Sequence, residues 1–93
     1  MKVSYNKNTT SLEIKITETG DKTQEIFDIL KEELNLYKDN SLYNILRFKI
    51  GIVHAAYVYL DKDNNIVMYM TTSLVYIDDL VLRLNNFMIR LNV

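Results

Sequence analysis

The segment from residue 73 to residue 93 carries two separate apolar faces when it is placed on a helix. Its sequence, SLVYIDDLVLRLNNFMIRLNV, contains no Gly and no Pro. At about 100° per residue, one broad apolar stripe runs along the whole helix. The stripe consists of Ile77, Leu80, Val81, Leu84, Phe87, Met88 and Leu91. A stripe of this width needs another element to cover it, so we expect this helix to pack against a sheet.

A second, narrower apolar line recurs every seven residues on roughly the opposite side of this helix. Its members are Val75, Leu82 and Ile89, and Asp, Asn and Arg residues fill the strips between the two faces. A chain of 93 residues buries only about 60–65% of the surface that its unfolded form exposes. It also has no Cys for a stabilising disulfide. The narrow line therefore predicts a partner, which we expect to be a second copy of the chain in a homodimer.

Alternating apolar and polar residues before this segment predict five strands and one further helix. We expect a hairpin at 2–6 and 11–17, a helix from 21 to about 38, and strands at 42–50, 53–60 and 66–71. The predicted fold class is α+β, a single domain over residues 1–93 in the order ββαβββα. It has an antiparallel five-stranded sheet with two helices on one face.

The predicted strands place aromatic and basic residues on the sheet face away from the helices. These residues are Tyr43, Ile45, Arg47, Lys49, Tyr57, Tyr59, Val67 and Tyr69. Such a face is typical of a protein interface, of a platform that stacks unpaired bases, or simply of strands that favour aromatic residues. Two cations in a chain of net charge −1 neutralise few phosphates. We therefore expect protein contact, with single-stranded nucleic-acid binding as the alternative.

Nothing in the sequence indicates an enzyme. His54 is the only side chain whose ordinary pKa lies near neutrality, and no residue beside it in the sequence would activate it as a catalytic base. The two glycines of the chain do not supply a Gly-rich phosphate loop. We expect no catalysis and no cofactor.

The segment 61–65, DKDNN, has the opening spacing of a calcium-binding EF-hand loop. The sixth position of that loop requires Gly and the twelfth requires Glu, but this chain has Ile66 and Thr72 there. We therefore expect a hairpin turn and no metal site.

Charge and hydropathy predict a cytoplasmic protein without a membrane segment. The net charge is −1, no basic stretch precedes an apolar stretch as in a signal peptide, and the apolar runs are far shorter than a bilayer requires. Asn, Ile, Lys and Tyr, which have AT-rich codons, occupy 35 of the 93 positions. This composition suggests a bacterium, a phage or an archaeal virus as the source, and hence a phage or viral accessory factor.

The sequence as a whole predicts a small, non-catalytic interaction protein. We expect a homodimer that also acts on a macromolecular partner, most simply another protein. The predicted interface residues are Val75, Leu82 and Ile89 on the helix, and Tyr43, Ile45, Arg47, Tyr57, Tyr59 and Tyr69 on the sheet.

Overall fold

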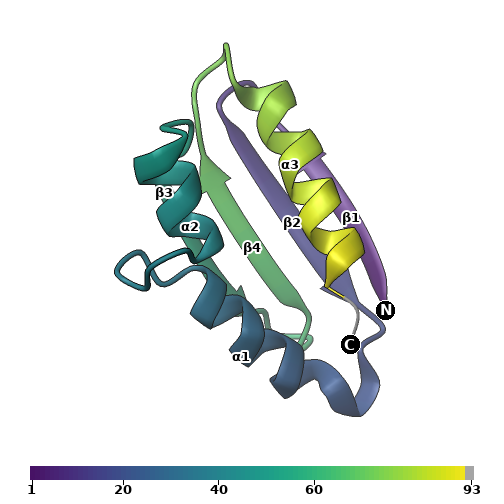
Figure 1. The fold of residues 1–93 in the computed structure, drawn as a ribbon. Helices are drawn as coiled ribbons and strands as arrows, with labels where there is room; N and C mark the ends of the chain where they lie inside the picture. Colours follow the sequence, from purple (N-terminus) through teal and green to yellow (C-terminus); the bar gives the residue numbers. More distant parts are fainter. Residues whose placement is uncertain (92–93) are drawn as a thin grey trace.

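The computed structural model describes residues 1–91 and has an α+β fold with one antiparallel sheet (Figure 1). Its strands are β1 (Lys2–Lys7), β2 (Ser11–Thr17), β3 (Ala55–Leu60) and β4 (Ile66–Thr71). Its helices are α1 (Thr23–Glu33), preceded by the short turn η1 (Gly20–Lys22), α2 (Leu42–Asn44), which continues into η2 (Ile45–Lys49), and α3 (Ile77–Arg90). Within residues 1–91 the fold thus consists of one four-stranded sheet and three helices, so the expected five strands and two helices are wrong.

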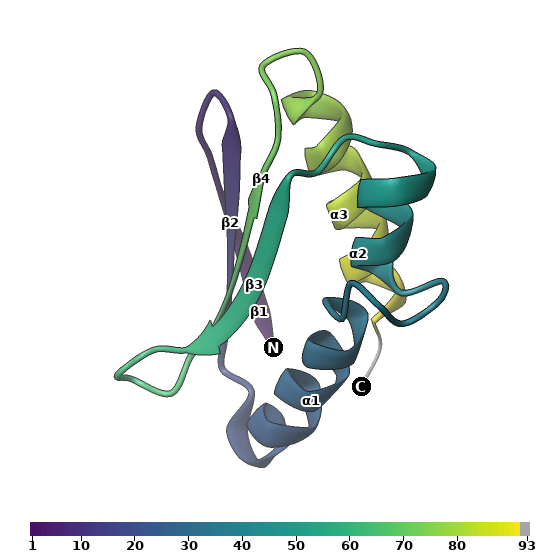
Figure 2. The same ribbon diagram turned by 90° about the vertical axis from the view of Figure 1, so that its left-hand side faces the viewer.

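The strands lie in the order β1-β2-β4-β3, so β1 and β3 form the two edges of the sheet. Every neighbouring pair is antiparallel, and the expected hairpin between the first two strands is confirmed, with Tyr5 opposite Ile14. Figure 2 shows the sheet on one side of the molecule and α1, α2 and α3 together on the other. All the described helices therefore cover the same face of the sheet.

One continuous apolar core fills the space between the sheet and the helices. The central strands bury every second residue, namely Leu12, Ile14 and Ile16 of β2 and Ile66, Met68 and Met70 of β4. The broad stripe of α3 meets them, as expected, and its buried members are Ile77, Leu80, Leu84, Phe87 and Met88. No helix within residues 1–91 combines the length and the apolar character that crossing a membrane requires.

The segment 42–50, which was expected to be a strand, is helical. Its buried residues are Tyr43 and Leu46, which are three positions apart, whereas Phe48 and Ile50 are exposed. A strand would have put Phe48 on the same face as Leu46. Burial of residues three positions apart is the pattern of a helix. A short apolar run fits the helical period of about 3.6 residues and the strand period of about 2, so periodicity alone does not distinguish a helix from a strand here.

Two local features, a side-chain cap and a glycine, define the ends of this helical segment. At its start, Ser41 Oγ accepts a hydrogen bond from the Asn44 N–H at 3.1 Å and donates one to the Asn35 carbonyl at 2.7 Å. At its end, Gly51 has a φ of +78°, and its N–H donates to the Leu46 carbonyl at 3.0 Å. A positive φ terminates a helix and costs Gly little. A serine cap and a glycine stop therefore delimit the helix that the alternation pattern concealed.

We expect Ser41→Ala to lower the free energy of unfolding by about 1–2 kcal/mol, because it removes the cap and leaves backbone groups without a partner. The Ser41 side chain is only 1% exposed, so water does not replace these bonds. Urea denaturation followed by circular dichroism measures the loss. Ser73→Ala is the matched control, since it precedes α3, whose N-cap is Tyr76 without a side-chain capping bond. Equal losses in the two variants would contradict the capping role of Ser41.

Two other boundaries differ from the sequence prediction. The helix expected to reach about residue 38 ends at Glu33, and Asn35 Oδ1 accepts a hydrogen bond from the Tyr37 N–H at 3.1 Å. Asn side chains that bond nearby backbone in this way favour turns over helix. The strand expected from residue 53 begins at Ala55. Val53 lies before the strand and is buried in the core.

Candidate interaction surfaces

The sheet face turned away from the helices is uncovered within residues 1–91 (Figure 2). The strand register gathers three tyrosines on this face. Tyr57 of β3 stands directly opposite Tyr69 of β4, and their ring centroids are 5.2 Å apart. Tyr59, two residues further along β3, stacks on Tyr57 with a centroid distance of 5.9 Å. The side chains of Tyr57 and Tyr59 are 51% and 43% exposed. We call these three residues the tyrosine cluster.

The surroundings of the tyrosine cluster carry both signs of charge. On β2, Glu13 stands opposite Tyr69 and Lys15 stands opposite Val67. Lys15 Nζ lies 3.6 Å from Asp61 Oδ2, in the turn between β3 and β4. The cation nearest the cluster on β2 thus already has a carboxylate partner, which leaves little positive charge for a phosphate backbone.

Three of the predicted interface residues do not lie on this face. Because the segment 42–50 is helical, Tyr43, Ile45 and Arg47 belong to the helical layer on the other side of the sheet. Tyr43 is buried in the core, and Arg47 Nη1 donates a hydrogen bond to the His54 carbonyl. The structure therefore brings together Tyr57, Tyr59 and Tyr69 but separates them from the basic residues expected beside them.

The narrow apolar line of the last helix forms a second exposed surface. Leu82 and Ile89 lie on α3 and are 58% and 70% exposed, whereas Val75 lies in the turn before the helix. This turn is closed by the Tyr76 N–H, which donates to the Ser73 carbonyl at 2.9 Å. The helix was expected to include residue 73, so its line of exposed apolar residues is shorter than predicted. We refer to Leu82 and Ile89 as the α3 line.

The polar strips on either side of the α3 line are engaged within the chain. Asp78 forms an ion pair with Lys7 of β1, with Oδ1 and Nζ 2.8 Å apart, and Asn85 Oδ1 accepts a hydrogen bond from the Tyr5 hydroxyl at 3.3 Å. Asp79, on the other strip, pairs with Arg83 at 3.0 Å. The contacts of Asp78 and Asn85 hold α3 against β1, whereas the Asp79–Arg83 pair lies within α3. Partial burial raises the pKa of Tyr5.

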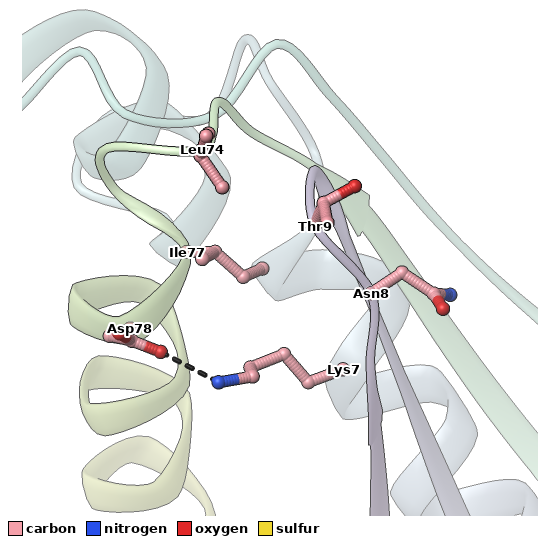
Figure 3. Close-up of a pocket in the computed structure, with 6 residues that line it drawn as sticks. All are labelled: Lys7, Asn8, Thr9, Leu74, Ile77 and Asp78. Carbon is pink, nitrogen blue, oxygen red and sulfur yellow. Dashed lines mark hydrogen bonds and ion pairs between the residues drawn. The ribbon is translucent and has the colours of Figure 1, made fainter.

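One hollow lies between the β1–β2 turn and the start of α3, with a volume of about 460 Å³ (Figure 3). Leu74 and Ile77 line it from the α3 side, and Thr9 lines it from the turn. Its two charged groups, Lys7 and Asp78, point toward each other and form the ion pair just described. Since these charges satisfy one another, the hollow presents no unpaired charged group to a ligand.

A second hollow, which the sequence did not reveal, lies between the 42–50 segment and α3. It has a volume of about 300 Å³ and is lined by Ile45 and Ile50 from one side and by Arg83 and Arg90 from the other. This hollow could not be predicted from the sequence, because its apolar wall is the 42–50 segment, which was predicted to be a strand. The helical spacing of Arg83 and Arg90 was visible, but the facing wall was not.

The polar residues singled out in the sequence, His54 and the segment 61–65, lie at the two ends of β3. His54 is exposed immediately before β3, and its N–H donates to the Thr71 carbonyl at 2.9 Å. Asp61 Oδ1 accepts from the N–H groups of Asn65 and Asp63, both at 2.9 Å, and the bond from Asn65 is the main cause that lowers the pKa of this carboxyl. Residues 61–65 thus form the expected hairpin turn. Among residues 1–91, no three His, Cys, Asp or Glu side chains gather in a group able to hold a metal ion.

The tyrosine cluster consists of aromatic side chains that pack on one another on the exposed surface of the described chain. The α3 line is smaller, and the two hollows carry charges that are partly paired within the chain. No protein-family model, no curated protein and no solved structure matches this chain.

Proposed function

We propose that this chain is a small, non-catalytic interaction protein of the cytoplasm that forms a homodimer and binds a further protein through the open face of its sheet. One observation carries this proposal. The face opposite the helices bears three packed tyrosines, two of which leave about half of their surface to solvent. Aromatic side chains of this kind supply much of the binding energy at protein interfaces.

Charge favours a protein over a nucleic acid as the ligand of this face. Arg47 and Lys49, which were expected there, lie in the helical layer, and Lys15 is paired with Asp61. Single-stranded nucleic-acid binding is the second candidate, since exposed tyrosines also stack bases. A phage or viral accessory role agrees with the AT-rich composition.

The proposed function is tested by photo-crosslinking with p-benzoylphenylalanine in place of Tyr69, in cells that make the protein. We expect a discrete adduct heavier than two copies of the chain, because Tyr69 borders the binding face but lies on β4, one strand in from the β3 edge. The matched control has the same probe in place of Tyr37, an aromatic residue that is 90% exposed but lies in the loop after α1.

The double variant Tyr57→Ala/Tyr59→Ala distinguishes a specific adduct from a chance one. Each truncated anchor residue at an interface costs about 1 kcal/mol or more, so we expect the Tyr69 adduct to fall at least tenfold. An adduct that persists in the double variant, or forms equally from residue 37, would contradict binding by the tyrosine cluster.

An oligonucleotide titration tests the second candidate. We expect no measurable binding of a single-stranded oligonucleotide at physiological salt. A submicromolar affinity that weakens as salt rises, and that falls by about 1–3 kcal/mol for each tyrosine removed, would instead make nucleic acid the ligand of this face.

A further inference from the structure

We propose that two copies of this chain join through β3, edge to edge, so that their two four-stranded sheets form one continuous sheet. This inference deepens the proposed homodimer and rests on it, because it names the strand that each copy contributes. It makes the open faces of the two copies, with their tyrosine clusters, parts of a single surface.

The edge of β3 is free and lacks the usual protection against pairing. β3 pairs with β4 on one side only, and Figure 2, which looks toward this edge, shows no described segment in front of it. Exposed edge strands are normally protected by Lys, Pro or a bulge. The sequence of β3, AAYVYL, contains no charge, no Pro and no Gly.

The opposite edge of the sheet is protected, which makes β3 the edge suited to pairing. β1 has the sequence KVSYNK, with a lysine at each end and the polar residues Ser4 and Asn6 alternating with Val3 and Tyr5 between them. Lys7 is also held by its ion pair with Asp78 of α3. The two edges of the sheet thus differ in their charged side chains, which protect β1 but not β3 against the addition of another strand.

The sequence of β3 is complementary to itself in one antiparallel register. Directly opposite residues must share a sheet face. Every twofold axis that passes through a residue of β3 satisfies this requirement, and the axis at Val58 is the one that pairs Tyr57 with Tyr59. Val58 then faces Val58 of the second copy, Ala56 faces Leu60, and Tyr57 faces Tyr59. Leu60 meets the small Ala56, Val58 meets an identical valine, and the two tyrosines meet each other in aromatic cross-strand pairs, which are stabilising.

The charges at the two ends of β3 fit the same arrangement. At the first end, the guanidinium of Arg47 lies against the strand through its hydrogen bond to the His54 carbonyl. At the other end, the turn that follows the strand carries Asp61, Lys62 and Asp63. Asp61 is paired with Lys15, whereas Asp63 forms no ion pair within residues 1–91. In the register centred on Val58, the Arg47 end of one copy meets the turn of the other, which has a net charge of −1, with Lys62 opposite His54 and Asp63 opposite Val53. This contact occurs twice by symmetry. This complementarity of charge indicates a second copy of the chain as the occupant of the edge.

The alternative dimer surface is the α3 line. It offers Leu82 and Ile89 from each copy, whereas a stable interface usually buries about 800 Å² on each partner. Pairing through β3 adds backbone hydrogen bonds to the apolar contacts, as in other cases of strand addition.

Single cysteines test the geometry, since the chain has none of its own. Directly opposed residues in an antiparallel pair have Cα atoms about 4.5–5.5 Å apart, which is within the range of a disulfide. We expect Val58→Cys to give mostly disulfide-linked dimer on mild oxidation, with an unchanged circular dichroism spectrum. Ala56→Cys is the matched control on the same strand and face, because its two copies would lie about 13 Å apart along the strands.

Leu82→Cys reports on the alternative dimer. Rapid crosslinking of Val58→Cys with slow crosslinking of Ala56→Cys and Leu82→Cys supports pairing through β3. Rapid crosslinking of Leu82→Cys alone would overturn it while leaving a homodimer that joins through α3, and equal rates for Val58→Cys and Ala56→Cys would overturn the register. The photo-crosslink from residue 69 to a further protein is independent of these outcomes, so the two proposals can fail separately.

Discussion

Leu80→Ala is expected to lower the free energy of unfolding by about 2–5 kcal/mol, the range for truncating a buried leucine and leaving a cavity. Leu80 is fully buried in the core between α3 and the sheet. A domain of this size has only about 5–15 kcal/mol of stability in total, so the variant should unfold at a much lower urea concentration. Circular dichroism during urea titration measures the change.

Leu82→Ala is the control for this experiment, since it makes the same substitution two residues away on the exposed side of α3. We expect its loss to stay within about 0.5 kcal/mol, as for most surface substitutions, at protein concentrations too low for association. Equal losses for Leu80→Ala and Leu82→Ala would mean that α3 is rotated about its axis from the position described here.

The second large effect is expected at the β3 edge, where two double variants with different charge patterns should differ in dimer affinity. In the register centred on Val58, residue 57 of one copy faces residue 59 of the other. Tyr57→Lys/Tyr59→Lys places like charges opposite each other twice, and we expect it to weaken dimerisation about 100-fold or more. Two aromatic pairs are lost and two repulsive pairs are gained, and each 1.4 kcal/mol is a factor of ten in affinity.

Tyr57→Lys/Tyr59→Glu loses the same two tyrosines but places opposite charges across the twofold axis. We therefore expect it to dimerise about tenfold more tightly than the double-lysine variant. Analytical ultracentrifugation over a concentration series measures both dissociation constants. If the two variants associate equally, residues 57 and 59 of different copies do not face each other.

The four strands, α1 and α3 follow from the sequence because each of them is marked by a single clear period. Leu12, Ile14 and Ile16 alternate strictly with polar residues, which predicts the half-buried strand that the structure contains. The broad stripe of the last helix extends over more than three turns, so its buried face was predicted correctly. Long patterns of this kind leave little choice of period.

The segment 42–50 was mistaken because its pattern is short. Leu42, Tyr43, Ile45 and Leu46 fit the helical spacing, whereas Leu46, Phe48 and Ile50 fit that of a strand. The decisive signals were Ser41, which caps the helix, and the positive φ of Gly51, which ends it. Tertiary packing of Leu46 then selects the helix.

This single error had consequences for the predicted interaction surface. It placed Arg47 and Tyr43 beside the tyrosines of β3 and β4, although they lie in the helical layer. Tyr57 and Tyr69 were assigned to the correct face because their strands were correct, but their direct opposition depends on a register that alternation alone does not determine. The free edge of β3 became apparent only from the order of the strands.

Sedimentation equilibrium of the unmodified protein tests most directly whether the chain acts as a homodimeric interaction protein. One chain has a mass of 11.0 kDa, and we predict a species of twice that mass at concentrations of about 10 µM and above, corresponding to a dissociation free energy of roughly 7–8 kcal/mol. A single species of 11.0 kDa at concentrations a hundred times higher would contradict the homodimer, and with it the pairing of two β3 strands.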